Sequence, residues 1–219
     1  MIRFSDVKSS EKIRTYIKRA DETLAVQGFT DHGFGHVTKV SEEAAAILRI
    51  MGYSEREAEL AQIAGFLHDI GNVINRAAHA QTGALLAFQL LEELGATPEE
   101  NATVITAIGN HDEGTSVPVS PICAAVILAD KSDVRASRVR NLETSTFDIH
   151  DRVNYAVKQS TLKISDDKAT INLELTIDTT YCAVMDYFEI FLTRMSLCRK
   201  AAEMLSLRFT LTINGQQLL

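Results

Sequence analysis

The sequence has few cysteines, no long apolar run and no excess of positive charge, and these absences exclude several classes of protein. Its three cysteines, Cys123, Cys182 and Cys198, are widely spaced and form no CxxC pair. We therefore expect reduced thiols in the core rather than disulfides or zinc ligands, and assign them no function. The longest apolar runs, such as 122–129, are far too short to cross a bilayer, so no membrane partner is expected.

The charge of the chain is negative. Its 219 residues carry a formal net charge of −7, whereas a general nucleic-acid binder needs a basic surface that displaces counterions from phosphates. Nucleic acid is therefore not an expected partner. A small phosphorylated substrate is compatible with this charge because a bound metal can supply positive charge locally. The first ten residues contain no apolar segment typical of a secretory signal, so a cytoplasmic location is expected.

Helical patterns dominate the first two thirds of the chain. The expected helices cover about 10–26, 37–51, 55–70, 79–94, 98–110 and 121–129. Their apolar residues recur at three- and four-residue spacing, and capping boxes, such as Ser54 with Glu57, mark where two of them begin. The last stretch is apolar on every side, which is typical of a buried helix, although a buried strand would show the same short run.

The pattern changes after about Asn141. It predicts a β-hairpin whose strands cover 161–164 and 169–177. A helix over about 180–205 and a strand over 207–213 follow. Alternating and β-branched residues on either side of a polar turn carry the hairpin prediction. We therefore predict a mainly α fold, with a helical domain over residues 1–140 and a small α+β subdomain over residues 141–219.

Two carboxylates end apolar segments. Asp69 follows His68 after the mostly apolar run 61–67, and Asp130 follows a second apolar run. A buried carboxylate is costly without a partner, and a divalent metal shared with a histidine would offset that cost. Taken alone, a His-Asp pair is as often structural, and an Asp after an apolar run could cap a turn. A metal site is favoured by the ordered set of His36, His68-Asp69 and Asp130, in which each member begins or ends an apolar helix.

This order resembles the signature of the HD superfamily of metal-dependent phosphohydrolases. The segment His68-Asp69-Ile70-Gly71 matches its HDIG form, His36-Val37-Thr38-Lys39-Val40 resembles its first helix, and Leu128-Ala129-Asp130-Lys131 resembles its ADK helix. The resemblance covers about residues 31–138 and implies an HD-domain helical bundle. The ligands that it implies for one divalent metal are His36, His68, Asp69 and Asp130. It also places Asp69 where it could bridge to a second ion.

Two further histidines indicate that second ion. His79 begins a segment that looks like the family's H…G helix start, and His111 lies in 110–113, which is similar to the HHE segment of dinuclear members. Asn110 replaces the first histidine of that segment, and the downstream GYP of cyclic-dinucleotide phosphodiesterases is absent, which argues against a third metal and such a substrate. The structural alternatives are a local hydrogen bond for His79 and a helix-dipole contact for His111. One or two ions among Mn, Fe, Co, Ni and Zn would suit these mixed donors.

Other residues near this set could act on a substrate. In the cyclic-nucleotide branch of the family, a histidine four residues before the first metal ligand is a general acid. By resemblance, His32 would protonate a leaving oxygen. The alternative is that His32 is a loop residue without this role, because Gly33 and Gly35 weaken a helix there. Lys131 would bind a phosphate oxygen or be solvated. Arg135, Arg138 and Arg140 are expected to form a solvated face, from which one arginine could reach the substrate. His150 has no partner pattern and is expected to be structural.

The resemblance implies a phosphohydrolase of the phosphatase or phosphodiesterase type, in which His32, Asp69 and Lys131 act on a phosphate ester or anhydride of a nucleotide or related small molecule. Bound metal would activate water and neutralise phosphoryl charge. Two rivals stay open. An O2-dependent di-iron oxygenase of the same superfamily could use the same ligands, and a non-catalytic nucleotide-binding or signalling module is disfavoured by the complete ligand set. The C-terminal subdomain would form a dimer interface or cover the active site, and we predict a homodimer.

Overall fold

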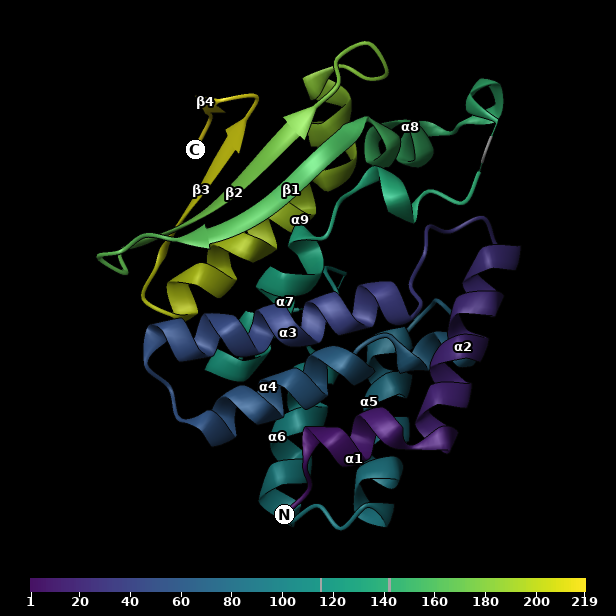
Figure 1. Cartoon of the computed structure of the whole chain (residues 1–219), viewed down its shortest axis with the longest axis vertical. Coiled ribbons are helices and arrows are strands. Elements are labelled where there is room, and N and C mark those ends of the chain that lie inside the picture. Colours follow the sequence, from purple (N-terminus) through teal and green to yellow (C-terminus); the bar gives the residue numbers. More distant parts are fainter. Residues whose placement is uncertain (115, 142) are drawn as a thin grey trace.

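The computed structural model describes residues 1–114, 116–141 and 143–219 (Figure 1). Helices form the first part of the chain. They are α1 (Phe4–Ser9), α2 (Glu11–Val26), α3 (Phe34–Met51), α4 (Glu55–Leu67), α5 (His79–Glu93), α6 (Pro98–Gly109) and α7 (Pro121–Ser132). Short 3₁₀ turns join or follow them at η1 (Ile70–Val73), η2 (Ala136–Arg138) and η3 (Thr144–Thr146).

The predicted capping residues set the starts of these helices. The Ser54 hydroxyl accepts a hydrogen bond from the backbone of Glu57, whose carboxylate accepts one from the backbone of Ser54 at 2.9 Å. Thr97 and Glu100 form the same reciprocal pair at the start of α6. The apolar run 122–129 is a helix rather than a strand, and every residue in it is buried, because α7 contacts α3, α4, α6 and α9.

The C-terminal part combines a sheet with two helices. Its elements are α8 (Ile149–Ala156), β1 (Val157–Ile164), β2 (Thr170–Ile177), α9 (Val184–Met204), β3 (Arg208–Ile213) and β4 (Gln216–Gln217). The strand order is β1-β2-β3-β4, with β1 antiparallel to β2 and β2 parallel to β3. The parallel pairing requires a crossover, which α9 supplies, and α9 contacts both β3 and α7 (Figure 1). The sheet is thereby attached to the helical bundle through α9.

These observations confirm the mainly α fold with a hairpin, helix and strand in its C-terminal part. The predicted boundaries were wrong in detail, because β1 begins at Val157 and α9 at Val184. The sequence patterns also missed α1, α8 and β4. One continuous apolar core includes residues from both parts of the chain. The division between residues 140 and 141 stays a prediction.

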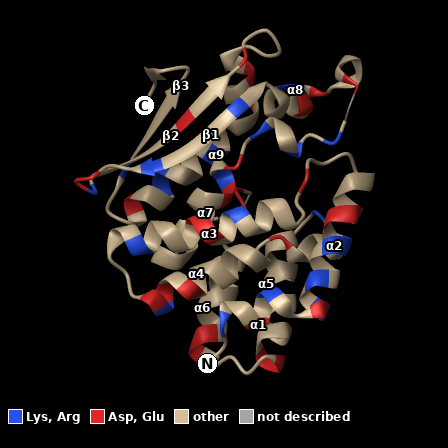
Figure 2. Cartoon of the chain, viewed as in Figure 1, with Lys and Arg blue, Asp and Glu red and all other residues tan. Residues whose placement is uncertain are grey.

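Basic and acidic residues are interspersed over the surface of the helices, for example along α2 (Figure 2). Within the described ranges, none of the helices combines the length and the apolarity that a bilayer span requires. The expectations about nucleic acid and membrane partners stay predictions.

Candidate metal centre

All six predicted metal ligands lie at or near helix ends and meet at one place in the bundle. His36 is in the first turn of α3, His68 and Asp69 join α4 to η1, and His79 is the first residue of α5. His111 follows the end of α6, and Asp130 lies in the last turn of α7. Four histidine rings are almost completely buried here, with exposed fractions between 0% and 3%. The fold therefore concentrates titratable groups where burial makes an unpartnered charge costly.

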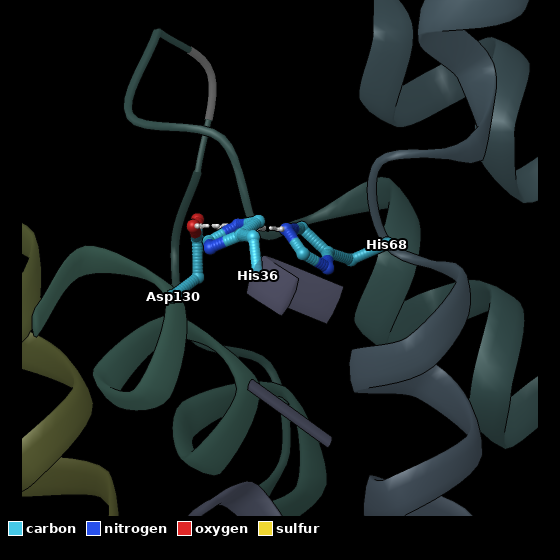
Figure 3. Close-up of side chains that lie close together, drawn as sticks. All are labelled: His36, His68 and Asp130. Atoms are coloured by element: carbon cyan, nitrogen blue, oxygen red, sulfur yellow. Dashed lines mark hydrogen bonds and ion pairs between the residues drawn. The ribbon is translucent and has the colours of Figure 1, made fainter. Parts of the chain in front are cut away.

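The first group of ligand atoms surrounds a point between α3, α4 and α7 (Figure 3). His36 Nε2 lies 3.3 Å from His68 Nε2 and 3.3 Å from Asp130 Oδ1, and His68 Nε2 lies 3.6 Å from the same oxygen. Asp69 Oδ2 is 3.3 Å from His68 Nε2 and 3.7 Å from His36 Nε2. Two nitrogens and two oxygens therefore converge, as at a transition-metal site.

A second group adjoins the first through Asp69. His79 Nε2 lies 3.2 Å from His111 Nε2 and 3.5 Å from Asp69 Oδ1. The ligand atoms of His68, Asp69 and His111 also lie within 4.8 Å of one another. The two oxygens of Asp69 thus face different ligand groups, which is the arrangement needed for a carboxylate that bridges two ions.

Hydrogen bonds fix the orientation of the four imidazoles. Each ring places its Nδ1 atom against an oxygen. His36 Nδ1 lies 2.8 Å from the carboxylate oxygen Asp133 Oδ2. The other three contact backbone carbonyls: His68 Nδ1 lies 2.8 Å from Gly65 O, His79 Nδ1 3.0 Å from Arg76 O, and His111 Nδ1 2.6 Å from Ile108 O. A carbonyl or carboxylate oxygen can only accept, so Nδ1 carries the proton and Nε2 of a neutral ring presents a lone pair. Lone pairs that face each other at 3.2–3.3 Å repel unless a cation or a proton lies between them. The residues present therefore fit a metal.

The electrostatics of these side chains also favour a cation at this place. Burial disfavours the charged form of His68, but the carboxylates of Asp69 and Asp130 outweigh it and raise the pKa of His68 to about 10. Burial likewise opposes ionisation of Asp69, but protonated His68 holds the pKa of Asp69 well below its ordinary value. Burial lowers the pKa of His79 and His111, which keeps these rings neutral. The proton on His68 thus supplies the positive charge that a metal would supply.

Asp133 supports the first ligand, and the sequence reasoning missed it. Its side chain is 1% exposed and accepts the Nδ1 proton of His36 at 2.8 Å. Arg135 Nε donates to its other oxygen at 2.8 Å, and Arg138 donates to its backbone carbonyl at 2.6 Å. The only local signal is the position of Asp133 three residues after Asp130 at a helix end. Its contact with His36 depends on the packing of α3 against α7.

We predict that Asp133→Asn lowers the affinity for the metal. The amide can still contact Nδ1 but loses the charge that makes the His36 imidazole a stronger donor, and loss of such a partner typically weakens metal binding about 10–100-fold. Competition with a chelator, followed by metal analysis, measures the effect. The exposed Asp166→Asn is the control, and equal affinities in the two variants would contradict the role of Asp133.

Two predicted catalytic residues adjoin the centre. His32 lies in the loop before α3, as the loop alternative predicted, with its Nδ1 2.6 Å from Thr30 O and its ring 5.5 Å from that of His36. Lys131 is 4% exposed, so the solvated alternative is wrong for it. Its Nζ lies 2.6 Å from Asp130 Oδ2 and 2.7 Å from Glu113 Oε2. Both residues are placed beside the metal ligands, and their roles stay predictions.

The prediction that three arginines lie on a solvated face is wrong for Arg138. This side chain is 5% exposed, and its Nε donates to Asp31 O at 2.8 Å. Arg135 pairs with Asp133, and Arg140 pairs with Asp21. Arg138 therefore joins the loop before α3 to the segment after α7.

A cavity of about 280 Å³ opens beside the ligands. It is large enough for part of a small molecule. The bundle and the loop before α3 contribute Gln27, Gly28, Phe29, Thr30, His32, Asp69, Arg76, His79, Asp130, Lys131 and Arg138. The C-terminal part contributes Asp148, His150, Asp151, Asn154, Phe191 and Arg194, from α8 and α9. The C-terminal part thus forms one side of the cavity, and its two predicted roles stay predictions. His150 is exposed and lines the cavity, and its structural role stays a prediction.

The chain is similar to several known proteins. The chain is 25% identical over 189 residues to the uncharacterized protein MJ1020 of Methanocaldococcus jannaschii, which covers 75% of this chain and 72% of the relative. A crystal structure of a predicted HD superfamily hydrolase from an uncultured Thermotogales bacterium is 26% identical, with a TM-score of 0.44, and covers 57% of this chain and 67% of that one. The model of the HD domain family matches residues 33–138. This segment, which is 106 of the 219 residues, contains all six converging predicted ligands, from His36 to Asp130, and matches an HD domain.

Proposed function

We propose that the chain is a metal-dependent phosphohydrolase that cleaves a phosphate ester or anhydride of a small molecule, with nucleotides as the expected substrate class. The HD domain supports a metal-dependent hydrolase of some kind. The observation that carries the finer proposal is the set of four basic side chains in the cavity wall. Lys131, Arg76, Arg138 and Arg194 line the cavity together with the predicted metal ligands Asp69, His79 and Asp130, and Asp148 and Asp151 also line it. A phosphoryl group carries the negative charge that such a wall binds.

One or two divalent transition metals would be held by His36, His68, Asp69 and Asp130, and by His79 and His111 across Asp69. When bound, such an ion lowers the pKa of a coordinated water and neutralises charge on a phosphoryl group. The guanidinium of Arg76 lies 5.5 Å from the Phe29 ring centroid, and its Nη1 is 3.7 Å from Asp69 Oδ1, so it is held in the cavity wall beside the Asp69 carboxylate. This position suits a residue that orients a phosphate next to the ions.

His32 is neutral in the free chain, because burial, assisted by the charge of Arg138, holds its pKa well below the ordinary value. Since its Nδ1 donates to Thr30 O, its Nε2 is a hydrogen-bond acceptor. His32 would therefore orient water or accept a proton in the resting site. The predicted role as a general acid requires that an anionic substrate first favour its protonated form.

The test is metal analysis combined with a panel of phosphomonoesters, phosphodiesters and nucleoside triphosphates. We expect the metal-replete protein to hydrolyse at least one class, and we expect a chelator to abolish turnover. Fully metal-loaded protein that hydrolyses none of them would contradict the proposal. Binding of a nucleotide without turnover would favour a binding module instead.

A second candidate is an O2-dependent di-iron oxygenase. Asp69 faces both ligand groups with separate oxygens, and this bridging geometry would suit two iron ions equally well. The four basic side chains that line the cavity beside the predicted metal ligands favour the hydrolase. Iron that changes oxidation state and consumes O2, together with no phosphate hydrolysis, would favour the oxygenase.

A further inference from the structure

A chain of ion pairs connects the C-terminal helix α9 with a predicted metal ligand. Arg194 Nε donates to Glu113 Oε1 at 2.9 Å, Glu113 Oε2 lies 2.7 Å from Lys131 Nζ, and Lys131 Nζ lies 2.6 Å from Asp130 Oδ2. Arg194 lies outside the segment that matches the HD family model. Its neighbours in the sequence match no motif that would indicate a role for it. The C-terminal part therefore reaches the centre through a charged side chain.

The guanidinium of Arg194 is held in a fixed orientation. Its carbon lies 4.7 Å from the ring centroid of Phe191, one helical turn earlier, and its Nε is bonded to Glu113. Its two terminal nitrogens have no hydrogen-bond partner in the part of the chain that the structure describes, although the residue lines the cavity. An arginine fixed in this way presents donors in the planar arrangement that matches two oxygens of a phosphate.

The balance of charge along the chain of ion pairs favours an anionic ligand. Lys131 lies between two carboxylates, those of Asp130 and Glu113. When Asp130 binds a cation, its charge is committed to that ion, so Lys131 and Arg194 share the single carboxylate of Glu113. Along this chain of ion pairs, one positive charge is then without a carboxylate partner of its own. A phosphoryl group bound there would neutralise it.

We propose that Arg194 is a substrate-binding residue, which contacts the phosphoryl group through its terminal guanidinium nitrogens. The phosphate pocket is then assembled from both parts of the chain, with the ions and Lys131 on the HD side and Arg194 on α9. This inference rests on the proposed function, because it takes the anion to be the phosphoryl group of the substrate.

The test compares Arg194→Gln with Arg199→Gln, which removes an exposed arginine from the same helix. The probe is inorganic phosphate, titrated calorimetrically into metal-loaded protein. We expect Arg194→Gln to retain its metal and to raise the Kd for phosphate about 10–100-fold, because a charge-assisted contact is lost. Arg199→Gln should bind phosphate as the unchanged protein does. Arg194→Lys keeps the charge but not the planar pair of donors, so it should give an intermediate Kd.

For a hydrolysed substrate, Arg194→Gln should raise KM more than it lowers kcat. Unchanged phosphate affinity in metal-loaded Arg194→Gln would overturn the inference, while turnover by the unchanged protein would leave the proposed function intact. The reverse result, phosphate binding that depends on Arg194 without hydrolysis of any phosphate ester, would support the anion site and contradict the proposed function. If Arg194→Gln fails to fold, the Arg194→Lys titration decides, and phosphate affinity equal to that of the unchanged protein would overturn the inference.

Discussion

Asp69→Ala is expected to abolish hydrolysis and to remove the metal from at least one ligand group. Asp69 is the residue that both groups share, with Oδ2 3.3 Å from His68 Nε2 and Oδ1 3.5 Å from His79 Nε2. Without it, neither group keeps its full set of donors. We expect kcat/KM to fall at least about a thousandfold, which corresponds to about 4 kcal/mol of transition-state stabilisation. Mass-spectrometric metal analysis and turnover assays on the same preparation measure both effects.

Two further variants separate the loss of a ligand from the loss of the fold. Asp69→Asn keeps the shape of the side chain and one oxygen, so its fold should be preserved while the bridging charge is lost. Asp166→Ala removes an exposed carboxylate in the β1–β2 turn and should change neither metal content nor turnover. Undiminished turnover in a folded Asp69→Ala protein would exclude the proposed mechanism.

Local signals explain why most helices of the bundle could be predicted. Ser54 with Glu57, and Thr97 with Glu100, lie three residues apart, so the capping interaction is present in the sequence itself. Helix α8 has a capping residue, Asp148, whose side chain accepts a hydrogen bond from Asp151 N at 2.8 Å, but its apolar signal is weak. It has eight residues, of which only Val153, Asn154 and Ala156 are buried, too few for a periodic apolar pattern.

The residues of the site also divide into those with a local sequence signal and those that only tertiary packing brings there. The six ligands were found because they end or begin apolar helices and match a family pattern, and the structure brings all six together, although their metal-binding roles stay predictions. Arg138 was predicted to lie on a solvated face and Asp133 was given no role, because burial of a charged side chain follows from tertiary packing that the sequence does not state. Arg194 lies 64 positions after Asp130 in the sequence, and only the packing of α9 on α7 brings it to the cavity. The homodimer and the cytoplasmic location stay predictions.

Gly71→Ala is expected to be strongly destabilising, although the substitution adds only one methyl group. A Cβ at this position would lie 2.0 Å from His79 O and 2.5 Å from Gly83 N. Both are backbone atoms of α5, so no side-chain rotation relieves the overlap, and η1 and α5 would have to move apart. Overpacking of this kind typically costs 1–3 kcal/mol and occasionally more, and we expect about 3 kcal/mol here. For a chain of this length, that lowers Tm by about 6–12 °C.

The displacement should also reach the metal centre, because η1 follows Asp69 directly and α5 begins with His79. Separating the two elements would lengthen the 3.5 Å contact between Asp69 Oδ1 and His79 Nε2, so the second ligand group should lose metal before the first. Denaturant unfolding and metal analysis measure the two effects. Gly109→Ala is the matched control, because its Cβ would meet only the Ala84 side chain at 3.6 Å, an ordinary contact, and its stability should be unchanged or slightly higher. If Gly71→Ala unfolds at the same denaturant concentration as Gly109→Ala and keeps the same metal content, then the close approach of η1 to α5 does not position His79.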